Sequence, residues 1–352
     1  MDLLRYFSRW LAATGRATLA DLLDDAPLNP VPINSALADF GRTLWREGAP
    51  YWRYCETCNA VASRQPLVRR SLGIAWDLAY TWLELEPHRH HLPVPPIVIV
   101  ALVVQSLLWG WPRVAALLFA GFSGMLRPAE FLCGVTRSLL VLLRDTLFTQ
   151  AFALMRIPSP KTRGSAGRHQ AGRIDHTEAV LLLDAVFGAL PPSCRLWPMS
   201  VSTFRSRFRA LLRALQLPFD RRLTYPRFDL GETVDLGSLR TSGTTWLWLE
   251  TQDAELVRQR GRWLSAKVMQ IYIQEALSVT FLARLPPGVL ANIERLSLLA
   301  PEVLEQSLEW LDAGVPSPSW PERWAREGQR GDFNSQKGQS QSPGTAPGFG
   351  ST

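Results

Sequence analysis

The sequence predicts a mainly α-helical protein with a small β-sheet, organised as two domains. Three observations support this fold class. Apolar residues recur at helical spacing over most of 1–91, three short apolar runs between 137 and 174 have the length of strands, and prolines follow residue 91. With 352 residues, the chain is long enough for each of two domains to bury its own core.

Residues 1–91 are expected to form a small helical bundle. Its apolar positions fall into three segments: Leu3, Phe7, Trp10 and Leu11; then Leu37, Phe40 and Leu44; then, after Pro66, Ile74, Leu78 and Trp82. Cys55 and Cys58 form a lone C-x-x-C, which favours neighbours on a helix over a zinc site because no second ligand pair follows. The arginines of the bundle either contact a DNA backbone or form a solvated face; they include Arg42, Arg46, Arg53, Arg64, Arg69 and Arg70.

The second domain is expected over 92–285, after a boundary at residues 88–91. The run His88-Arg89-His90-His91 and the prolines behind it favour an exposed linker over a metal site, since a metal would need ligands from elsewhere. Residues 97–122 are apolar enough to suggest a membrane span, yet Pro112 divides them into two lengths typical of buried helices. We therefore expect a pair of core helices here.

Strands are expected at 137–143, 150–157 and 170–174, and helices at 177–190 and 200–215. Between the last two strands lies a basic hairpin without an acidic residue, whose charges are Lys161, Arg163, Arg168 and Arg173. Such a hairpin can neutralise phosphates, although an ordinary solvated hairpin has the same composition. The helix over 200–215 faces either DNA or solvent with four arginines, Arg205, Arg207, Arg209 and Arg213.

The C-terminal part is expected to contain a helical segment over 286–315 and a disordered tail over 316–352. The helical segment is amphipathic, with Val303, Leu304, Leu308 and Leu311 on one face. It therefore either packs within the chain or mediates assembly. Ser, Pro, Gly and Gln dominate the tail, a composition that buries too little apolar surface to fold.

The stretch from Val234 to Glu275 contains residue types that suit phosphate chemistry. Ser238 is expected to cap a helix that has Arg240 in its first turn, where backbone N–H groups already favour a phosphate. Trp263 follows a basic turn, and Tyr272 comes nine residues later. This spacing indicates an anion site with a guanidinium and a phenol close by.

A second polar cluster lies far upstream, in the apolar stretch GFSGMLRPAEFL. Arg127 and Glu130 stand there at i and i+3. A charge that enters an apolar core without a partner is costly, so the two side chains are expected to meet. The pair either serves packing alone or belongs to a functional site.

Together these two regions resemble the catalytic domain of tyrosine recombinases (phage integrases), of the eukaryotic type or the type carried by mobile elements. The resemblance rests on the R-x-x-E at Arg127, on Leu239-Arg240-Thr241 as the second arginine box, and on Trp263 and Tyr272 at the family's usual distance. It departs at the H-x-x-R box, whose first position is Gly237. The general acid/base imidazole of the family is missing from that position.

No other histidine is placed by the sequence to substitute for this imidazole. His169 and His176 follow the hairpin lysine, too far along the chain for the sequence to relate them to the site. A missing acid/base group commonly costs about 10² to 10⁴ in rate. Catalysis is therefore expected to be impaired rather than abolished.

The resemblance implies a mechanism. Tyr272 would attack a duplex phosphodiester and form a 3′-phosphotyrosyl bond, while Arg127 and Arg240 hold the charge of the transition state. Glu130 would support the site, Trp263 would donate its indole N–H to a phosphate oxygen, and Lys161 would protonate the leaving 5′-oxygen. No cofactor or metal is implied. The implied DNA-binding residues are Arg163, Arg168, Arg173, Arg205 and Arg209.

The composition suits an anionic partner, and double-stranded DNA is the first candidate. There are 38 Lys and Arg against 31 Asp and Glu, which gives a net charge of +7. The resemblance implies that residues 1–91 form a DNA-clamping core-binding domain and that the protein is a homo-oligomer, dimer to tetramer, on DNA. The expected compartment is the nucleus in a eukaryote and the cytoplasm otherwise, since no signal peptide begins the chain and four cysteines suit a reducing environment.

Three other functions remain compatible with the sequence. A recombinase relative without catalytic activity would bind DNA and not cut it. A type IB topoisomerase would use the same arginines and tyrosine without needing paired sites. An α-helical interaction protein with a basic surface would require the order of the motifs to be a coincidence.

Overall fold

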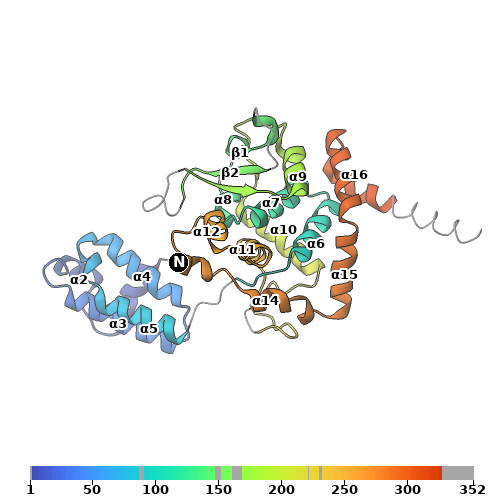
Figure 1. Ribbon diagram of the computed structural model, residues 1–352. Helices are drawn as coiled ribbons and strands as arrows, with labels where there is room; N and C mark the ends of the chain where they lie inside the picture. Colours follow the sequence, from blue (N-terminus) through green and yellow to red (C-terminus); the bar gives the residue numbers. More distant parts are fainter. Residues whose placement is uncertain are drawn as a thin grey trace, which may run out of the picture. The chain divides into compact units, whose positions relative to one another are not determined.

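The structure is a computed structural model that describes residues 2–86, 91–146, 152–160, 169–220, 222–229 and 232–326. The chain divides into two compact units, Met1–Arg89 and His90–Thr352. Helices dominate the described residues of both units, and the second unit adds a three-stranded antiparallel sheet. The predicted fold class, mainly α with a small β-sheet, is confirmed (Figure 1).

The first unit is a helical bundle with its own core. Its helices are α1 (Leu3–Ala13), α2 (Leu19–Asp25), α3 (Val31–Arg46), α4 (Tyr51–Arg64), the 3-10 helix η1 (Pro66–Arg70) and α5 (Gly73–Leu85). The core contains most of the apolar positions expected from the helical spacing, among them Phe7, Leu11, Leu37, Phe40, Leu44 and Trp82. Ile74 differs from the expectation, because it is 46% exposed while Ala75, Ala79 and Trp82 form the buried face of α5.

Two buried polar side chains fix the start of α5. Asn34 on α3 donates to the Ser71 carbonyl at 3.0 Å and accepts from the Ala75 N–H at 2.9 Å. The Tyr54 hydroxyl on α4 donates to the Ala75 carbonyl at 2.8 Å. Buried polar groups are costly unless they are paired, so these bonds hold α3, α4 and α5 in one register.

The second unit is built around two apolar helices. Its elements before the sheet are α6 (Pro96–Leu108), α7 (Pro112–Ser123) and α8 (Pro128–Leu132). The helix pair expected over 97–122 is present and divides at Pro112, which occupies the first turn of α7, where its missing N–H costs nothing. Both helices are buried over most of their length.

The sheet consists of β1 (Leu140–Val141), β2 (Ala153–Ile157) and β3 (Gln170–Ile174), in the order β1-β2-β3. All pairs are antiparallel, with Leu140 opposite Met155 and Met155 opposite Gly172. The first strand is shorter than predicted. Residues Arg137–Leu139 form the 3-10 helix η2 instead, because the Arg137 guanidinium binds the Leu140 carbonyl at 2.6 Å and Asp145 at 2.7 Å.

The remaining helices surround α6 and α7. They are the 3-10 helix η3 (Leu143–Asp145), α9 (Thr177–Phe187), α10 (Val201–Ala214), α11 (Ser238–Thr251), α12 (Ala254–Gly261), α13 (Ala266–Gln270), α14 (Glu275–Thr280), the 3-10 helix η4 (Leu282–Arg284), α15 (Pro287–Leu298), α16 (Ala300–Asp312) and the 3-10 helix η5 (Ser317–Ser319). Helices α9 and α10 lie within the segments predicted to be helical. Figure 1 shows α6 and α15 running side by side, and the two helices are in contact.

Glycines allow α7 and α11 to approach closely. A Cβ on Gly243 would lie 2.0 Å from the Phe122 carbonyl oxygen, and a Cβ on Gly121 would lie 2.9 Å from the Leu239 side chain. The first eight residues of α11, from Ser238 to Thr245, are all buried. Several hydroxyl side chains of this helix are buried and bonded, as in the 2.7 Å bond from Thr244 to the Arg240 carbonyl.

The C-terminal segment packs within the chain. Both α15 and α16 contact α6, and Val303 is part of the core. The predicted start of the disordered tail at 316 is wrong, because Ser317–Ser319 form η5 and residues 320–326 continue as a helix. The cause is Trp320, which is 0% exposed and packs on Trp310 with ring centroids 5.4 Å apart. The rest of the predicted tail, 327–352, lies outside the described residues.

No helix in the described part of the chain has the length and apolarity needed to cross a bilayer. The same residues contain no group of three or more His, Cys, Asp or Glu side chains arranged to hold a metal ion. Cys55 and Cys58 lie one turn apart on α4, with free thiols.

Replacing Trp320 with alanine should lower the free energy of unfolding of the full chain by about 3–5 kcal/mol, the usual cost of removing a large buried aromatic side chain. Chemical denaturation followed by circular dichroism measures the effect. Trp52, which is 52% exposed, provides the matched control. Equal effects of Trp320→Ala and Trp52→Ala would contradict the docking of residues 317–326 on the core.

Candidate functional site

Three arginines from distant parts of the chain meet around the carboxylate of Glu130. Arg127 lies 2.6 Å from Oε1, Arg262 lies 2.8 Å from Oε2, and Arg240 lies 3.8 Å from Oε2. The Arg127 backbone N–H also donates to Oε2 at 2.8 Å. The Glu130 side chain is only 8% exposed. The cluster thus places three positive charges against one negative charge in a largely buried position.

Arg240 is held in place by backbone carbonyls and aromatic rings. Its guanidinium donates to the Met125 carbonyl and to the Gly261 carbonyl, each at 2.6 Å. It also lies 4.5 Å from the ring centroid of Trp263 and 5.3 Å from that of Tyr272. The Nε atom is buried and has no hydrogen-bond partner in the described residues. Carbonyls and rings together position a charge that is almost completely buried.

Arg262 belongs to the cluster and was not among the predicted site residues. It ends α12 in the left-handed conformation, with φ at 60°, which turns its side chain back toward the loop between α7 and α8. There it donates to the Gly124 and Met125 carbonyls at 3.1 and 3.0 Å. The sequence contains one signal of this role: Arg262 stands between Gly261 and Trp263, where the family places its glycine directly before the His or Trp.

Charge and burial shift the pKa values of the cluster. Burial raises the pKa of Glu130, but the charge of Arg262 and the hydrogen bonds from Arg127 outweigh burial, so the pKa is lowered. Burial lowers the pKa of Arg240, and the positive charges of Arg262 and Arg127 lower it further. Burial also lowers the pKa of Arg262. Mutual repulsion of the arginines means that a bound anion would stabilise the cluster.

Tyr272 is attached to the helix that carries Arg240. Its backbone carbonyl accepts a 2.9 Å hydrogen bond from Thr245 on α11, and the same hydroxyl accepts from the Gln274 N–H at 3.2 Å. The Tyr272 ring packs against Trp263, with centroids 4.9 Å apart. In the described residues the phenol hydroxyl makes no hydrogen bond, which leaves it available to a ligand. Thr245, which is fully buried, is a positioning residue that sequence reasoning missed.

Two details of the predicted site are different in the structure. Ser238 does not cap α11 with its side chain; it lies inside the first turn, and Asp235 accepts the Gly237 and Ser238 N–H groups at 2.8 and 3.2 Å. The expected phosphate donor of Trp263, its indole N–H, is buried without a partner among the described residues. The ring of Trp263 serves instead as a packing surface between Arg240 and Tyr272.

The predicted DNA-binding arginines differ in their exposure and in their partners, and some lie outside the described residues. Arg173 is already paired with Asp175 at 2.6 Å and lies over the Phe152 ring. Arg205 and Arg209 are exposed on α10 and line a pocket of about 550 Å³, here called the arginine pocket, with Arg213, Phe219, Asp220, Arg222 and Asp235. Lys161, Arg163 and Arg168 lie outside the described residues. Of the predicted catalytic residues, the structure brings together Arg127, Glu130, Arg240, Trp263 and Tyr272.

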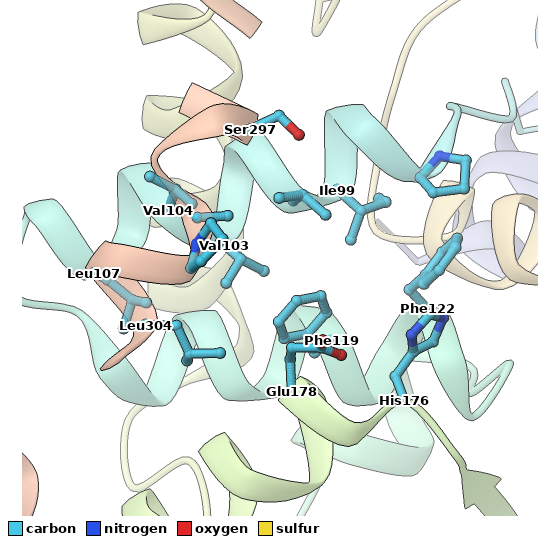
Figure 2. A pocket seen from close by; sticks show the side chains of 14 residues that line it. Ile99, Val103, Val104, Leu107, Phe119, Phe122, His176, Glu178, Ser297 and Leu304 are labelled. Carbon is cyan, nitrogen blue, oxygen red and sulfur yellow. The ribbon is translucent and has the colours of Figure 1, made fainter. Parts of the chain in front are cut away.

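A separate apolar cavity of about 430 Å³ lies between α6, α7 and the junction of α15 and α16. Figure 2 shows Ile99 and Val103 on one wall, Phe119 and Phe122 on another, and His176 at the edge. His176 packs on Trp246 with ring centroids 4.8 Å apart. None of the clustered arginines lines this cavity.

No model of a known protein family matches the chain, and no curated protein matches it in sequence. Among solved structures, it is similar to a lambda integrase dimer bound to a COC′ core site, with 12% identity and a TM-score of 0.44 over 78% of this chain and 77% of that chain. It is also similar to the XerH site-specific recombinase bound to its difH substrate in a pre-cleavage complex. The identity is 12% and the TM-score is 0.37, over 64% of this chain and 67% of that chain. A third similar structure is that of the XerA recombinase, with 15% identity and a TM-score of 0.36 over 84% of this chain and 97% of that chain. At these TM-scores the similarity assigns no function to the chain, so its function has to be inferred from side-chain geometry.

Replacing Glu130 with glutamine should reduce the free energy of unfolding by about 3–5 kcal/mol at pH 7, because it leaves buried guanidinium groups without their carboxylate. Folding lowers the pKa of Glu130 from its ordinary value of 4.5. The ionised Glu130 carboxylate therefore contributes fully to the free energy of unfolding above pH 4.5. This contribution is lost as the pH falls through the lower pKa that Glu130 has in the folded state.

The measurement is urea unfolding of the wild type and of Glu130→Gln between pH 7 and pH 3. The difference between the two proteins should shrink below about pH 4.5. Glu294→Gln, at an exposed position on α15, should match the wild type throughout. A difference that stays constant down to pH 3 would show that the charge of Glu130 does not hold the arginines.

Proposed function

We propose that this protein is a site-specific DNA recombinase that cuts and rejoins duplex DNA through a 3′-phosphotyrosyl intermediate. The observation that carries the proposal is the meeting of Arg127, Arg240 and Arg262 on the carboxylate of Glu130, with the Tyr272 ring 5.3 Å from the Arg240 guanidinium. The excess of positive over negative charge favours an anion, and an unpaired phenol beside that anion site is a nucleophile in position.

The chemistry follows from the charges. In the transition state of phosphoryl transfer, negative charge gathers on the non-bridging oxygens of the phosphate. Guanidinium groups already fixed by carbonyls and Glu130 need little reorganisation to hold that charge, which is the condition for electrostatic catalysis. Attack by Tyr272 displaces the 5′-oxygen, whose proton would come from Lys161, a residue of the hairpin that the sequence predicts. The energy of the phosphodiester is kept in the phosphotyrosyl bond, so rejoining needs no added energy source.

DNA binding is supported by the arginine pocket. Arg205 and Arg209 stand one helical turn apart on the exposed face of α10, at a spacing that lets both reach the same backbone. The first unit would act as the DNA-clamping domain through its exposed arginines, such as Arg69 and Arg70. Exchange of strands between two sites would require a homo-oligomer of two to four protomers on DNA.

Two other functions make different predictions for the same site. A catalytically inactive relative would use the arginine cluster to bind DNA and would leave Tyr272 unreacted. A type IB topoisomerase would form the same covalent bond but would relax single duplexes without pairing two sites. The buried, partner-free indole N–H of Trp263 and the glycine at 237 are the observations that favour an inactive relative.

Tyr272→Phe should abolish covalent attachment to DNA while leaving binding unchanged, since it removes one oxygen and keeps the ring that packs on Trp263. Incubation with nicked or suicide duplexes, followed by denaturing electrophoresis, measures the adduct. Tyr80→Phe, at a tyrosine that is 63% exposed, is the matched control. Tight binding without an adduct in the wild type would identify an inactive DNA-binding protein, and an adduct that survives in Tyr272→Phe would assign the nucleophile elsewhere.

Arg209→Ala should weaken binding to duplex DNA of any sequence and reduce the slope of log K against log salt by about 1, the effect of losing one phosphate contact. Fluorescence anisotropy over a range of salt concentrations measures both quantities. Arg295→Ala removes an exposed arginine on α15, far from α10 in the sequence, and should leave the slope unchanged. The same slope for all three proteins would argue against a DNA contact at the arginine pocket.

A further inference from the structure

We propose that His91, a residue of the interdomain boundary, is the acid–base group of the recombinase site. The inference rests on the proposed function. It starts from Gly237, three residues before Arg240. If Gly237 had a side chain, its Cβ would lie 2.5, 2.5 and 2.6 Å from the Cε1, Nε2 and Cδ2 atoms of His91. The imidazole of His91 thus fills the space into which a side chain at 237 would project.

The packing of His91, and not the backbone conformation, distinguishes a glycine from other residues at this position. Gly237 has φ −70° and ψ −27°, a right-handed helical conformation that any residue adopts. Nearly equal distances to three ring atoms place the Cβ position over the face of the imidazole, not at its edge. Contacts of this length would force the ring to move if residue 237 had a side chain, so a glycine at this position makes room for His91.

Asp235 orients the imidazole. Its Oδ1 atom lies 2.8 Å from Nδ1 of His91. The same oxygen accepts the N–H groups of Gly237 and Ser238, so the carboxylate is fixed to the start of α11. A carboxylate on Nδ1 holds the proton there and leaves Nε2 for chemistry, which is how histidine is prepared for proton transfer in other enzymes. In the described residues Nε2 has no hydrogen-bond partner, and the side chain is 44% exposed.

The segment that carries His91 is attached to the same helix. The Val94 N–H donates to the Ser242 hydroxyl on α11 at 2.8 Å, and Leu92 and Val94 are buried at 2% and 1% exposure. His91 is therefore followed within three residues by a second anchor on α11. The position of the imidazole depends on the helix that carries Arg240 and Thr245, not on a free linker.

The space that the imidazole fills adjoins the position of Arg240 on α11. Residues at i and i+3 of a helix share a face, with Cβ atoms about 5–6 Å apart, so the space of a side chain at 237 adjoins Arg240. Asp235, the partner of His91, lines the arginine pocket together with Arg205 and Arg209. A DNA backbone that passes from the arginine pocket to Arg240 would come within reach of Nε2.

In the proposed reaction, His91 accepts the phenol proton of Tyr272 and later returns it. When the Tyr272 oxygen bonds to phosphorus, the bond from phosphorus to the 5′-oxygen breaks, and the phenol proton passes to Nε2 of His91. The leaving 5′-oxygen takes a proton from a separate acid, the role that the proposed function gives to Lys161. In the rejoining step the 5′-hydroxyl attacks phosphorus and gives its proton back to the acid that supplied it, the phosphotyrosyl bond breaks, and His91 returns the other proton to the Tyr272 oxygen. The sequence places no histidine to substitute for an imidazole at Gly237, and this proposal assigns that role to His91.

The test compares variants in the rate of covalent adduct formation on a suicide duplex at saturating DNA. His91→Ala and His91→Gln should each be about 10² to 10³ slower than the wild type, in the range of a lost acid–base group. Glutamine keeps a donor toward Asp235 but cannot exchange a proton. His91→Ala combined with Gly237→His should recover much of the rate, because the imidazole then occupies the same space from the other chain segment. His169→Ala, at an exposed histidine, is the control.

The outcomes separate the two proposals. If the wild type forms an adduct and His91→Ala keeps its rate, the role of His91 is overturned and the recombinase proposal stands. If His91→Ala is slow and the double variant does not recover, His91 only holds the segment to α11, and the inference is again overturned. A wild type that forms no adduct at all overturns both proposals. DNA affinity and thermal unfolding of each variant show whether a loss of rate comes from misfolding.

Discussion

The site depends on one buried carboxylate. Glu130 contacts Arg127 and Arg262 directly and stands 3.8 Å from Arg240. Arg240 and Arg262 come from the consecutive helices α11 and α12, more than 100 residues after Arg127. Three guanidinium groups repel one another strongly in a medium of low dielectric constant. A shared counter-charge offsets this repulsion. The carboxylate therefore holds the cluster in place, and one carboxylate against three cations leaves room for an anion.

Backbone carbonyls, together with Glu130, hold the arginine side chains in place. The Met125 carbonyl accepts from both Arg240 and Arg262. Met125 and Arg262 both have positive φ, at 45° and 60°. Conformations of this kind are costly for residues other than glycine and persist where the surroundings enforce them. Their presence on both sides of the cluster shows that the loop after α7 and the end of α12 are shaped to aim carbonyls and side chains at one point.

Helix α11 connects the cluster to the remaining parts of the site. It carries Arg240, its Thr245 hydroxyl fixes the backbone of Tyr272, and its start packs against the ring of His91. A helix that makes all these contacts has to lie in the interior of the unit. Gly243 allows α11 this position because it lets the helix approach α7 closely. Two buried hydroxyls of α11 belong to the same arrangement, because Ser242 accepts the Val94 N–H and Thr245 donates to the Tyr272 carbonyl, backbone groups outside the helix.

The sequence by itself determined the local features. Helical spacing located the helices, Pro112 divided the apolar run, and the motifs named Arg127, Glu130, Arg240 and Tyr272. These signals are readable because each depends on residues within a few positions of one another. The start of the tail was misjudged for the opposite reason, since only the distant Trp310 shows that Trp320 is buried.

Only the tertiary structure decided which distant residues join the site. Arg262 contributes through a left-handed backbone, Thr245 through a hydroxyl that reaches the carbonyl of Tyr272, and His91 through space left free at Gly237. Thr245 and His91 have no sequence pattern of their own, and the displaced glycine before Trp263 is the one signal for Arg262, because each contact joins segments between 27 and about 150 residues apart. A glycine that the sequence presents as a missing histidine becomes, once the chain is folded, the gap that an imidazole from elsewhere fills.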